Sequence, residues 1–444
     1  MNIAIGAFLN EWVFFKFSDK LKFAIKVSLS LTLAYMIPMV MGWAQPNTAA
    51  ITVMLIASVG GVSESVTKGI IRVIGTVIGA TLGIVLISLF PQDRLLYLLT
   101  LSLIVSAITY FYYAYQGDST VFMLSAMVMM MIYLSGPENA FIYGIDRTYM
   151  TIFGIAVYTF VGIFLWPFTA STNKLNDEPK GERFIWLDPE YLKATMQLFF
   201  VFWFSVAFWI YLNPPGGFLV VILASMLGLL TTFSPLKPSI LIILFTLGFI
   251  FATLMYVFVL PNLVYAWELA LFLFMYTFIA FYLISPKLTI FFLLGLFVLG
   301  IDNTMSYNFD VFLMTLLVFY IFLVILMFFY NFPFSSKPEH LFGVLKERFF
   351  KHTSTVIELK EQGTLSWFTR LKLNYYKQHQ HRCISKLKLW GSKIDTNYFN
   401  KVSKEQINEF IVECEKYLLN NASLQSCYNT SDKINWQSLK VNKF

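Results

Sequence analysis

The chain alternates long apolar runs with short polar connectors. If about 20 apolar residues make one membrane crossing, this pattern predicts twelve helical segments, six on each side of a polar connector at 171–190. We expect the first six at 22–41, 46–61, 68–90, 95–114, 119–135 and 145–166, and the second six at 193–212, 217–233, 238–260, 264–284, 288–300 and 309–332. The sequence therefore predicts an all-α polytopic membrane protein.

The two sets of segments share one order of landmarks. The matched positions are Lys22 with Lys193, Lys68 with Lys237, Gly79 with Gly248 and Asp146 with Asp310. The offset between matched positions stays between 164 and 171 residues, as expected for an internal repeat. Because each set holds an even number of segments, we expect two parallel six-helix repeats, related by an axis along the membrane normal.

These landmarks divide the chain into five expected regions. An N-terminal helix at 1–21 carries apolar residues at helical spacing and should lie in the membrane interface. The first repeat follows at 22–168, a cytoplasmic connector at 169–192, the second repeat at 193–334 and a basic, helical cytoplasmic region at 335–444. Within that last region, Ser403-x-x-Gln406 resembles a capping box at the start of an amphipathic helix.

Composition and charge agree with a membrane protein. Hydrophobic residues make up 58% of the chain and charged residues 13%, too few charges to cover a soluble protein of this size. The net charge of +7 is concentrated in region 335–444, which holds 18 Lys+Arg against 10 Asp+Glu. Lys and Arg also gather in alternate connectors, so both termini are expected in the cytoplasm. A basic region beside a membrane indicates contact with lipid rather than with nucleic acid.

A glycine-rich stretch at 67–83 holds the candidate site. Lys68, Arg72 and Thr76 are spaced by four residues and so share one face of a helix. A second stripe, made of Gly75, Gly79 and Gly83, allows another helix to approach closely. Two interpretations stay open. Either the cations are the positive flank of a helix that only packs, or Lys68, Arg72 and Thr76 bind an anionic substrate at the cytoplasmic mouth of a pathway.

Two carboxylates at matched positions, Asp146 and Asp310, are candidates for proton coupling. A carboxyl group near the end of a membrane helix binds and releases a proton as it alternates between wet and dry surroundings. A local ion pair between Asp146 and the adjacent Arg147 is the simpler alternative.

Metal and nucleotide sites are not expected. All three cysteines and all four histidines lie in region 335–444, and the cluster His379-x-His381-x-Cys383 lacks a second pair of ligands. We interpret that cluster as solvated surface, with no metal and no cofactor. The sequence also lacks a G-x-x-x-x-G-K-[ST] phosphate-binding loop, which argues against ATP as the energy source.

Two motifs in the first repeat carry a family resemblance. Pro46-x-x-Ala49-x-Ile51-Thr52-Val53 and Lys68-Gly69-x-x-Arg72-x-x-Gly75-Thr76-x-x-Gly79-Ala80 resemble the fusaric acid resistance and aromatic acid exporter family. The plant aluminium-activated malate transporters carry a similar Lys-Gly-x-x-Arg-x-x-Gly-Thr element. The resemblance implies a bacterial inner-membrane protein of two six-helix halves, a carboxylate substrate that is often aromatic, and Lys68 and Arg72 near the anion path.

The chain departs from the family pattern in two places. Many relatives insert a cytoplasmic domain between the halves, whereas the connector at 171–190 is short. The second repeat has Leu241, Leu244 and Phe245 where Arg, Gly and Thr would stand.

Three functions follow from this pattern. The first is export of small organic or aromatic carboxylic acids, driven by the proton gradient or by the gradient of the anion itself. The alternatives are an anion channel and a non-transporting envelope assembly protein, in which the basic region would be the working part. None of the three is an enzyme. As partners we expect membrane lipid and the organic anion, and we also consider a homodimer and a periplasmic adaptor.

Overall fold

A computed structural model describes most of the two apolar halves and of the basic region. The described residues are 18–57, 62–115, 117–165, 184, 188–214, 216–231, 238–284, 286–302, 308–330, 332–334, 337–361, 366–394, 403–419, 424–432 and 434. They form helices, and the only β-type pairing among them is one isolated bridge between Tyr115 and Phe184. The all-α prediction is thus confirmed, whereas the predicted interfacial helix at 1–21 lies almost wholly outside the described residues.

The chain divides into two compact units. The first comprises residues 1–232 and 236–327 and contains nearly all of both predicted repeats, and the second comprises residues 233–235 and 328–444. The second unit therefore corresponds closely to the basic region predicted at 335–444.

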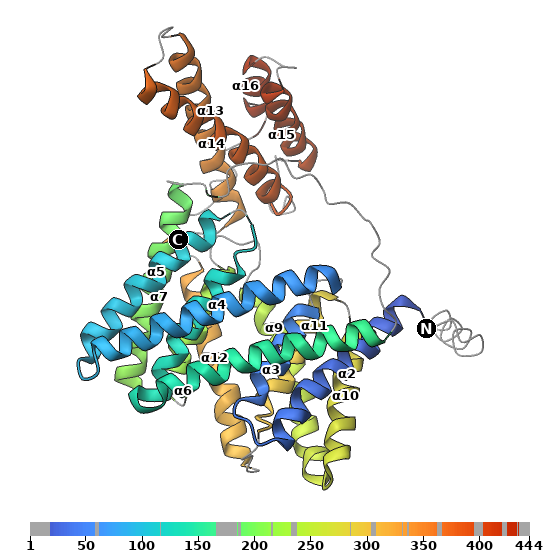
Figure 1. Ribbon diagram of the computed structural model, residues 1–444. Coiled ribbons are helices and arrows are strands. Elements are labelled where there is room, and N and C mark those ends of the chain that lie inside the picture. Colours follow the sequence, from blue (N-terminus) through green and yellow to red (C-terminus); the bar gives the residue numbers. More distant parts are fainter. Residues whose placement is uncertain are drawn as a thin grey trace. The chain divides into compact units, whose positions relative to one another are not determined.

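Every apolar segment predicted from the sequence overlaps a helix of the structure (Figure 1). In the first half these are α2 (Asp19–Val40), α3 (Pro46–Ala57), α4 (Val62–Leu89), α5 (Arg94–Ala114) and α6 (Thr120–Phe164). In the second half they are α7 (Pro189–Leu212), α8 (Leu219–Thr231), α9 (Pro238–Phe258), α10 (Ala266–Tyr282), α11 (Pro286–Val298) and α12 (Phe309–Phe329), with the short 3-10 helix η1 (Leu260–Asn262) after α9.

Helix α6 covers two predicted segments, and a break in its helical path at Gly136 separates them. This residue has φ 75° and ψ 165°, a conformation open to glycine, and Pro137 follows it. In the second half the matched residue, Gly300, also has a positive φ of 63° and lies between α11 and α12. The fifth and sixth segments are therefore separated by the same kind of break in each half.

The two halves pack on each other through matched pairs of helices. Helix α5 of the first half packs on α7, and the matched pair, α10 and α2, packs in the same way. Likewise α6 contacts α8, and α11 contacts α3. Side-chain hydrogen bonds cross this interface: Tyr113 Oη donates to the carbonyl of Leu229 at 2.8 Å, and Trp203 Nε1 donates to Ser102 Oγ at 3.2 Å. Matched helices of the two halves therefore contact each other reciprocally, while the parallel arrangement of the repeats stays a prediction.

Helix length separates crossing from partial segments. Among the described residues, seven helices are long and apolar enough to cross a membrane, whereas α3, α8 and α10 are apolar but shorter. At 1.5 Å per residue, the 12 residues of α3 extend about 18 Å, less than the roughly 30 Å hydrocarbon core. By these seven helices the protein is a multi-pass membrane protein.

The second unit is a helical domain with its own core. Helices α13 (Pro338–Glu361), α14 (Trp367–Gly391), α15 (Lys404–Leu418) and α16 (Leu424–Asp432) surround a cluster that includes Phe342, Phe349, Leu387 and Phe410. The predicted capping box is present: Gln406 N donates to Ser403 Oγ at 3.2 Å, and Ser403 N donates to Gln406 Oε1 at 3.1 Å. This confirms the helix start inferred from the sequence.

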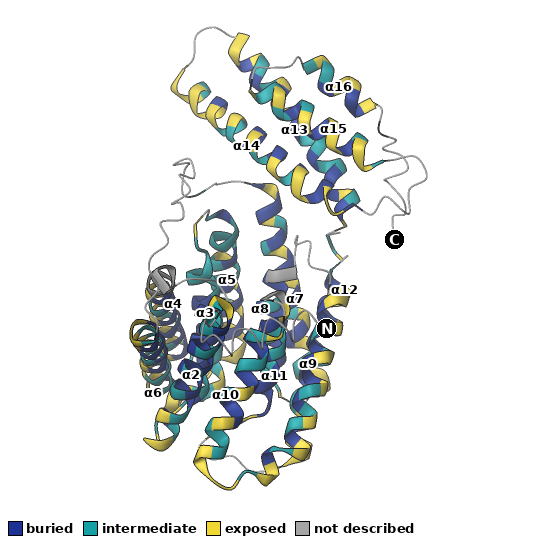
Figure 2. Ribbon diagram, turned by 90° about the vertical axis from the view of Figure 1, so that its right-hand side faces the viewer, coloured by how far each residue is buried: buried dark blue, intermediate teal, exposed yellow. Residues whose placement is uncertain are grey.

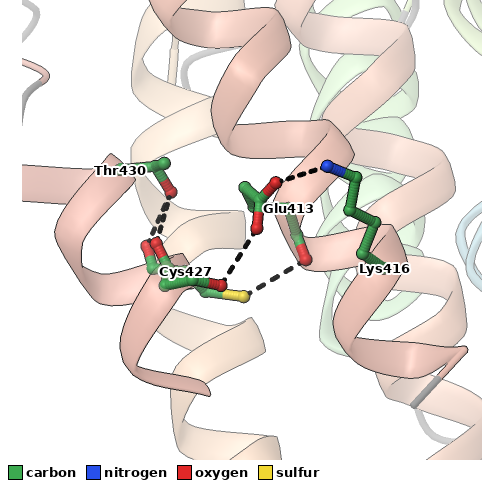
Figure 3. Close-up of polar contacts among 5 residues, drawn as sticks. Glu413, Lys416, Cys427 and Thr430 are labelled. Atoms are coloured by element: carbon green, nitrogen blue, oxygen red, sulfur yellow. Dashed lines mark hydrogen bonds and ion pairs between the residues drawn. The ribbon is translucent and has the colours of Figure 1, made fainter. Parts of the chain in front are cut away.

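Helices α15 and α16 are joined around Glu413, as Figure 3 shows. The carboxylate of Glu413 accepts from Lys416 Nζ at 2.7 Å and from Ser426 Oγ at 3.0 Å. The Glu413 carbonyl accepts from Cys427 Sγ at 3.3 Å. One acidic residue therefore fixes the start of α16 against α15.

One expectation for this unit is wrong. The cluster at 379–383 was interpreted as solvated surface, but His379 and Cys383 are buried and only His381 is exposed. The buried pair faces inward because α14 packs along α13, where Gln380 Nε2 donates to Thr353 Oγ1 at 2.7 Å. These side chains belong to the core of the unit.

The contact between α4 and α6 gives a first testable prediction. An added β-carbon at Gly79 would lie 2.5 Å from the carbonyl oxygen of Ser125, and one at Gly248 would lie 2.8 Å from that of Phe291. We expect Gly79→Ala and Gly248→Ala each to lower the free energy of unfolding by about 1–3 kcal/mol, although alanine favours an isolated helix by about 1 kcal/mol over glycine. Denaturation in mixed micelles measures the change.

The control for this prediction is Val77→Ala. Val77 lies on α4 and is exposed, so its change should stay within about 0.5 kcal/mol. Equal stabilities of Gly79→Ala and Val77→Ala would show that the backbones do not meet at this seam.

Candidate functional site

The candidate site is built on the close contact between α4 and the first part of α6. The structure places all three glycines of the stripe, Gly75, Gly79 and Gly83, directly against residues 121–132. In addition, Ser125 Oγ donates to the carbonyl of Gly75 at 3.0 Å and to that of Val121 at 2.8 Å. Without side chains in the way, the two helices approach within backbone contact, and this sets their axial register.

That register brings Arg72 toward the start of α6. The Arg72 side chain is only 8% exposed, and its guanidinium interacts electrostatically with the carboxylate of Asp118. Asp118 is itself held in place, because it accepts hydrogen bonds from the backbone N–H of Thr120 at 3.0 Å and from the Thr120 hydroxyl. A buried cation at one end of α4 therefore has a fixed carboxylate near it.

Of the other two predicted anion-binding residues, the structure describes the side chain of Thr76 but not that of Lys68. Thr76 lies one turn beyond Arg72 on α4 and is 3% exposed, so its hydroxyl belongs to the same buried face. Lys68 lies in α4, but its side chain is outside the described residues. The structure thus brings together Arg72, Thr76 and Asp118, of which the sequence predicted the first two.

The predicted proton-coupling residues lie elsewhere. Gly144 packs beside Ala80, whereas Ile155 packs beside Gly69, so Asp146 lies level with the far half of α4 rather than with Arg72. Asp146 is half-buried, and Asp310 is exposed in the first turn of α12. Both stay candidates, but neither belongs to the Arg72 cluster.

The local ion pair considered for Asp146 is not present. Both Asp146 and Arg147 lie in the described part of α6, and no ion pair joins them there. Instead, Arg147 Nη1 donates to Tyr143 Oη at 3.3 Å. The simpler explanation for Asp146 therefore does not account for its carboxylate.

Sequence reasoning missed two charged residues. Asp118 lies between two predicted apolar segments, and nothing local marks it as an electrostatic partner of a residue 46 positions earlier. Lys26 lies inside the first apolar segment, and in α2 it is 4% exposed among buried Ser28, Ser30 and Thr32. Its position four residues after Lys22, inside an apolar run, was the available signal.

The second half carries no matching charges. By the repeat offset, Lys26 corresponds to Gln197 and Arg72 corresponds to Leu241, and both of these residues are buried. No group of three or more His, Cys, Asp or Glu side chains suited to a metal ion occurs among the described residues. Among the described residues of the membrane unit, the buried cations are Lys26 and Arg72, both in the first half, whereas the buried carboxylates are Asp188 and Glu190 at the start of α7.

The pairing of Arg72 with Asp118 can be tested by a double-mutant cycle. Arg72→Met leaves Asp118 without its cation, and Asp118→Asn leaves the buried cation without its carboxylate. We expect the double variant to lose less stability than the sum of the losses in the two single variants. The difference, which is the coupling energy, should be about 1 kcal/mol or more. Denaturation in mixed micelles provides the four values.

Arg94→Met is the control, because Arg94 is exposed at the first residue of α5 and its neutralisation should have little effect. Additive effects of the Arg72 and Asp118 substitutions would contradict an interaction between the two side chains.

Comparison with known proteins gives one match. Residues 20–179 match the model of the Fusaric acid resistance protein family. No curated protein and no solved structure matches the chain. The matched stretch contains the first half of the membrane unit together with Lys26, Arg72, Thr76 and Asp118. The resemblance inferred from the sequence is thus confirmed: residues 20–179 are similar to the fusaric acid resistance protein family, and the chain is a multi-pass membrane protein.

Proposed function

We propose that this protein exports small organic acids, aromatic carboxylates among them, from the cytoplasm across the bacterial inner membrane. The observation that carries the proposal is the buried guanidinium of Arg72 in a membrane helix, whose charge interacts with that of Asp118, within the stretch that matches the family. A charge buried in a membrane helix is costly and is retained mainly where ions or substrates pass.

The chemistry of binding is an exchange of carboxylates. A guanidinium holds a carboxylate through two parallel hydrogen bonds, which a lysine cannot reproduce. In the resting protein Asp118 supplies the negative charge, and the substrate's carboxylate takes its place during transport. Thr76, one turn further along α4, offers a hydroxyl donor to the same substrate.

The aromatic part of the substrate needs an apolar surface. Rings of α5, of α6 and of Phe218, which precedes α8, meet between the two halves: the Tyr97 and Tyr133 ring centroids are 5.0 Å apart, and Phe218 lies 4.5 Å from Tyr133. These rings lie level with Gly83 of α4, which packs on Ile132 and stands about 16 Å along the helix from Arg72. In this proposal they meet a flat aromatic substrate after it leaves Arg72.

The direction of transport follows from topology and membrane potential. With both termini in the cytoplasm, the end of α4 that carries Lys68 and Arg72 faces the cytoplasm, where a basic mouth attracts organic anions. A potential that is negative inside then favours outward movement of each negative charge by about 2.3 kcal/mol per 100 mV. Asp146 and Asp310 are the carboxylates that we assign to proton coupling, where protons share in the driving force.

The double variant Lys68→Ala/Arg72→Ala tests the proposal. We expect it to insert normally but to lose export of an aromatic acid by tenfold or more, because a neutral mouth neither captures nor holds the carboxylate. Release of a radiolabelled aromatic acid from proteoliposomes measures export. Arg94→Ala removes a cation from an exposed site in another helix and should leave the rate unchanged. Full export by the double variant would refute the role of this site.

The two alternatives make separate predictions. An anion channel passes current in planar bilayers in proportion to the driving force and without proton exchange, whereas we expect substrate flux that saturates. For an assembly protein the basic region is the working part. Because that region has its own core, its deletion after residue 334 should leave the membrane unit able to transport. Complete loss of flux with correct insertion would favour the assembly role.

A further inference from the structure

Helix α14 differs in charge from every other helix of its unit. It carries six cations, which are Arg370, Lys372, Lys377, Arg382, Lys386 and Lys388, and no Asp or Glu between Trp367 and Gly391. Helices α13, α15 and α16 each contain at least one acidic residue. The positive charge of the unit is therefore concentrated on this helix.

The first turns of α14 also expose large apolar side chains. Trp367 is 71% exposed, Phe368 75% and Leu371 49%. Arg370 and Lys372, which lie between and beside them, are exposed too. A small domain rarely leaves a tryptophan and a phenylalanine side by side in water without a partner.

The exposed residues share a face, and the opposite face is occupied. Trp367, Arg370, Leu371 and Lys377 lie on one side of the helix, and Phe368 and Lys372 extend this surface around its exposed first turns. The other side packs on α13, where Leu373 meets Val356 and Leu359 in a small buried cluster. Figure 2 shows the resulting division of α14 into buried and exposed stretches. The exposed face is a fixed feature of the folded unit.

We propose that this face, formed by Trp367, Phe368, Arg370, Leu371, Lys372 and Lys377, binds the surface of an anionic lipid bilayer. Tryptophan and phenylalanine settle at the level of the headgroups, and Lys and Arg beside them attract anionic lipid. The proposal is independent of the transport activity and of its substrate.

Charge and tethering select the bilayer over other partners. A second copy of the unit would present the same positive face, and the two copies would repel each other. A bilayer is also always at hand, because the unit follows α12, a helix apolar and long enough to cross the membrane. Tethering of this kind raises the effective concentration of lipid at the face, so that even a weak interaction is populated.

A spin label on the full chain in nanodiscs tests the proposal. Phe368→Cys carries the label, and the native thiols of Cys383, Cys414 and Cys427 are buried, so the parent chain serves as the labelling blank. Collision rates with oxygen, which partitions into lipid, and with a water-soluble nickel chelate report the environment of the label. In discs that contain phosphatidylglycerol, we expect the ratio of oxygen to nickel collisions at 368 to exceed that at the control by about tenfold.

The control is Leu419→Cys, since Leu419 is 70% exposed in the same unit at the end of α15. In phosphatidylcholine discs, and in the variant Arg370→Glu/Lys372→Glu/Lys377→Glu, the ratio at 368 should fall to that at 419. Equal ratios at the two sites in phosphatidylglycerol discs would overturn the proposal. So would a label at 368 that neither reagent reaches, because protein rather than lipid would then cover the face.

Discussion

The structure of the membrane unit depends on how closely α4 approaches α6. In a bilayer the surrounding lipid is as apolar as the helix surface, so helices associate through van der Waals contact rather than through the hydrophobic effect. Gly75, Gly79 and Gly83 make that contact a backbone contact, with no room for a methyl group at Gly79. The same contact fixes the height of Arg72 relative to the start of α6, where Asp118 lies. The contact between α4 and α6 therefore determines both the packing of these helices and the position of Arg72 relative to Asp118.

The second half has a similar close contact between α9 and α11, but the residues beside that contact are apolar. Gly248 of α9 lies against Phe291 of α11 as Gly79 lies against Ser125 of α6, and Gly295 of α11 lies against Gly248 in turn. One turn before the seam, however, the second half has Leu241 and Phe245 in place of Arg72 and Thr76, and both are buried in apolar surroundings. The two halves thus form similar helix contacts, while a buried cation occupies this level of the helix in the first half only.

The sequence predicted the parts of this arrangement that depend on local pattern. Apolar run length located each helix, glycine spacing marked the face of α4 that packs, and the Ser403 capping box marked the start of α15. The parts that depend on tertiary contact were missed. The electrostatic interaction of Arg72 with Asp118 depends on the register between α4 and α6, and the burial of Lys26, His379 and Cys383 depends on neighbouring helices. Local hydropathy carries no information on any of these contacts.

Comparison of Arg72 with the matched residue of the second half, Leu241, bears on why Arg72 is charged. A buried ion pair can often be replaced by apolar residues at no cost in stability, because desolvation offsets much of its attraction. In this chain that replacement already exists: Leu241 occupies the matched position of α9, is 1% exposed and leaves the α9–α11 contact intact. Packing alone therefore does not require a cation at this level of the helix. The guanidinium of Arg72 is buried against a desolvation cost that packing does not require, and this is the physical reason why we propose an anionic ligand for it.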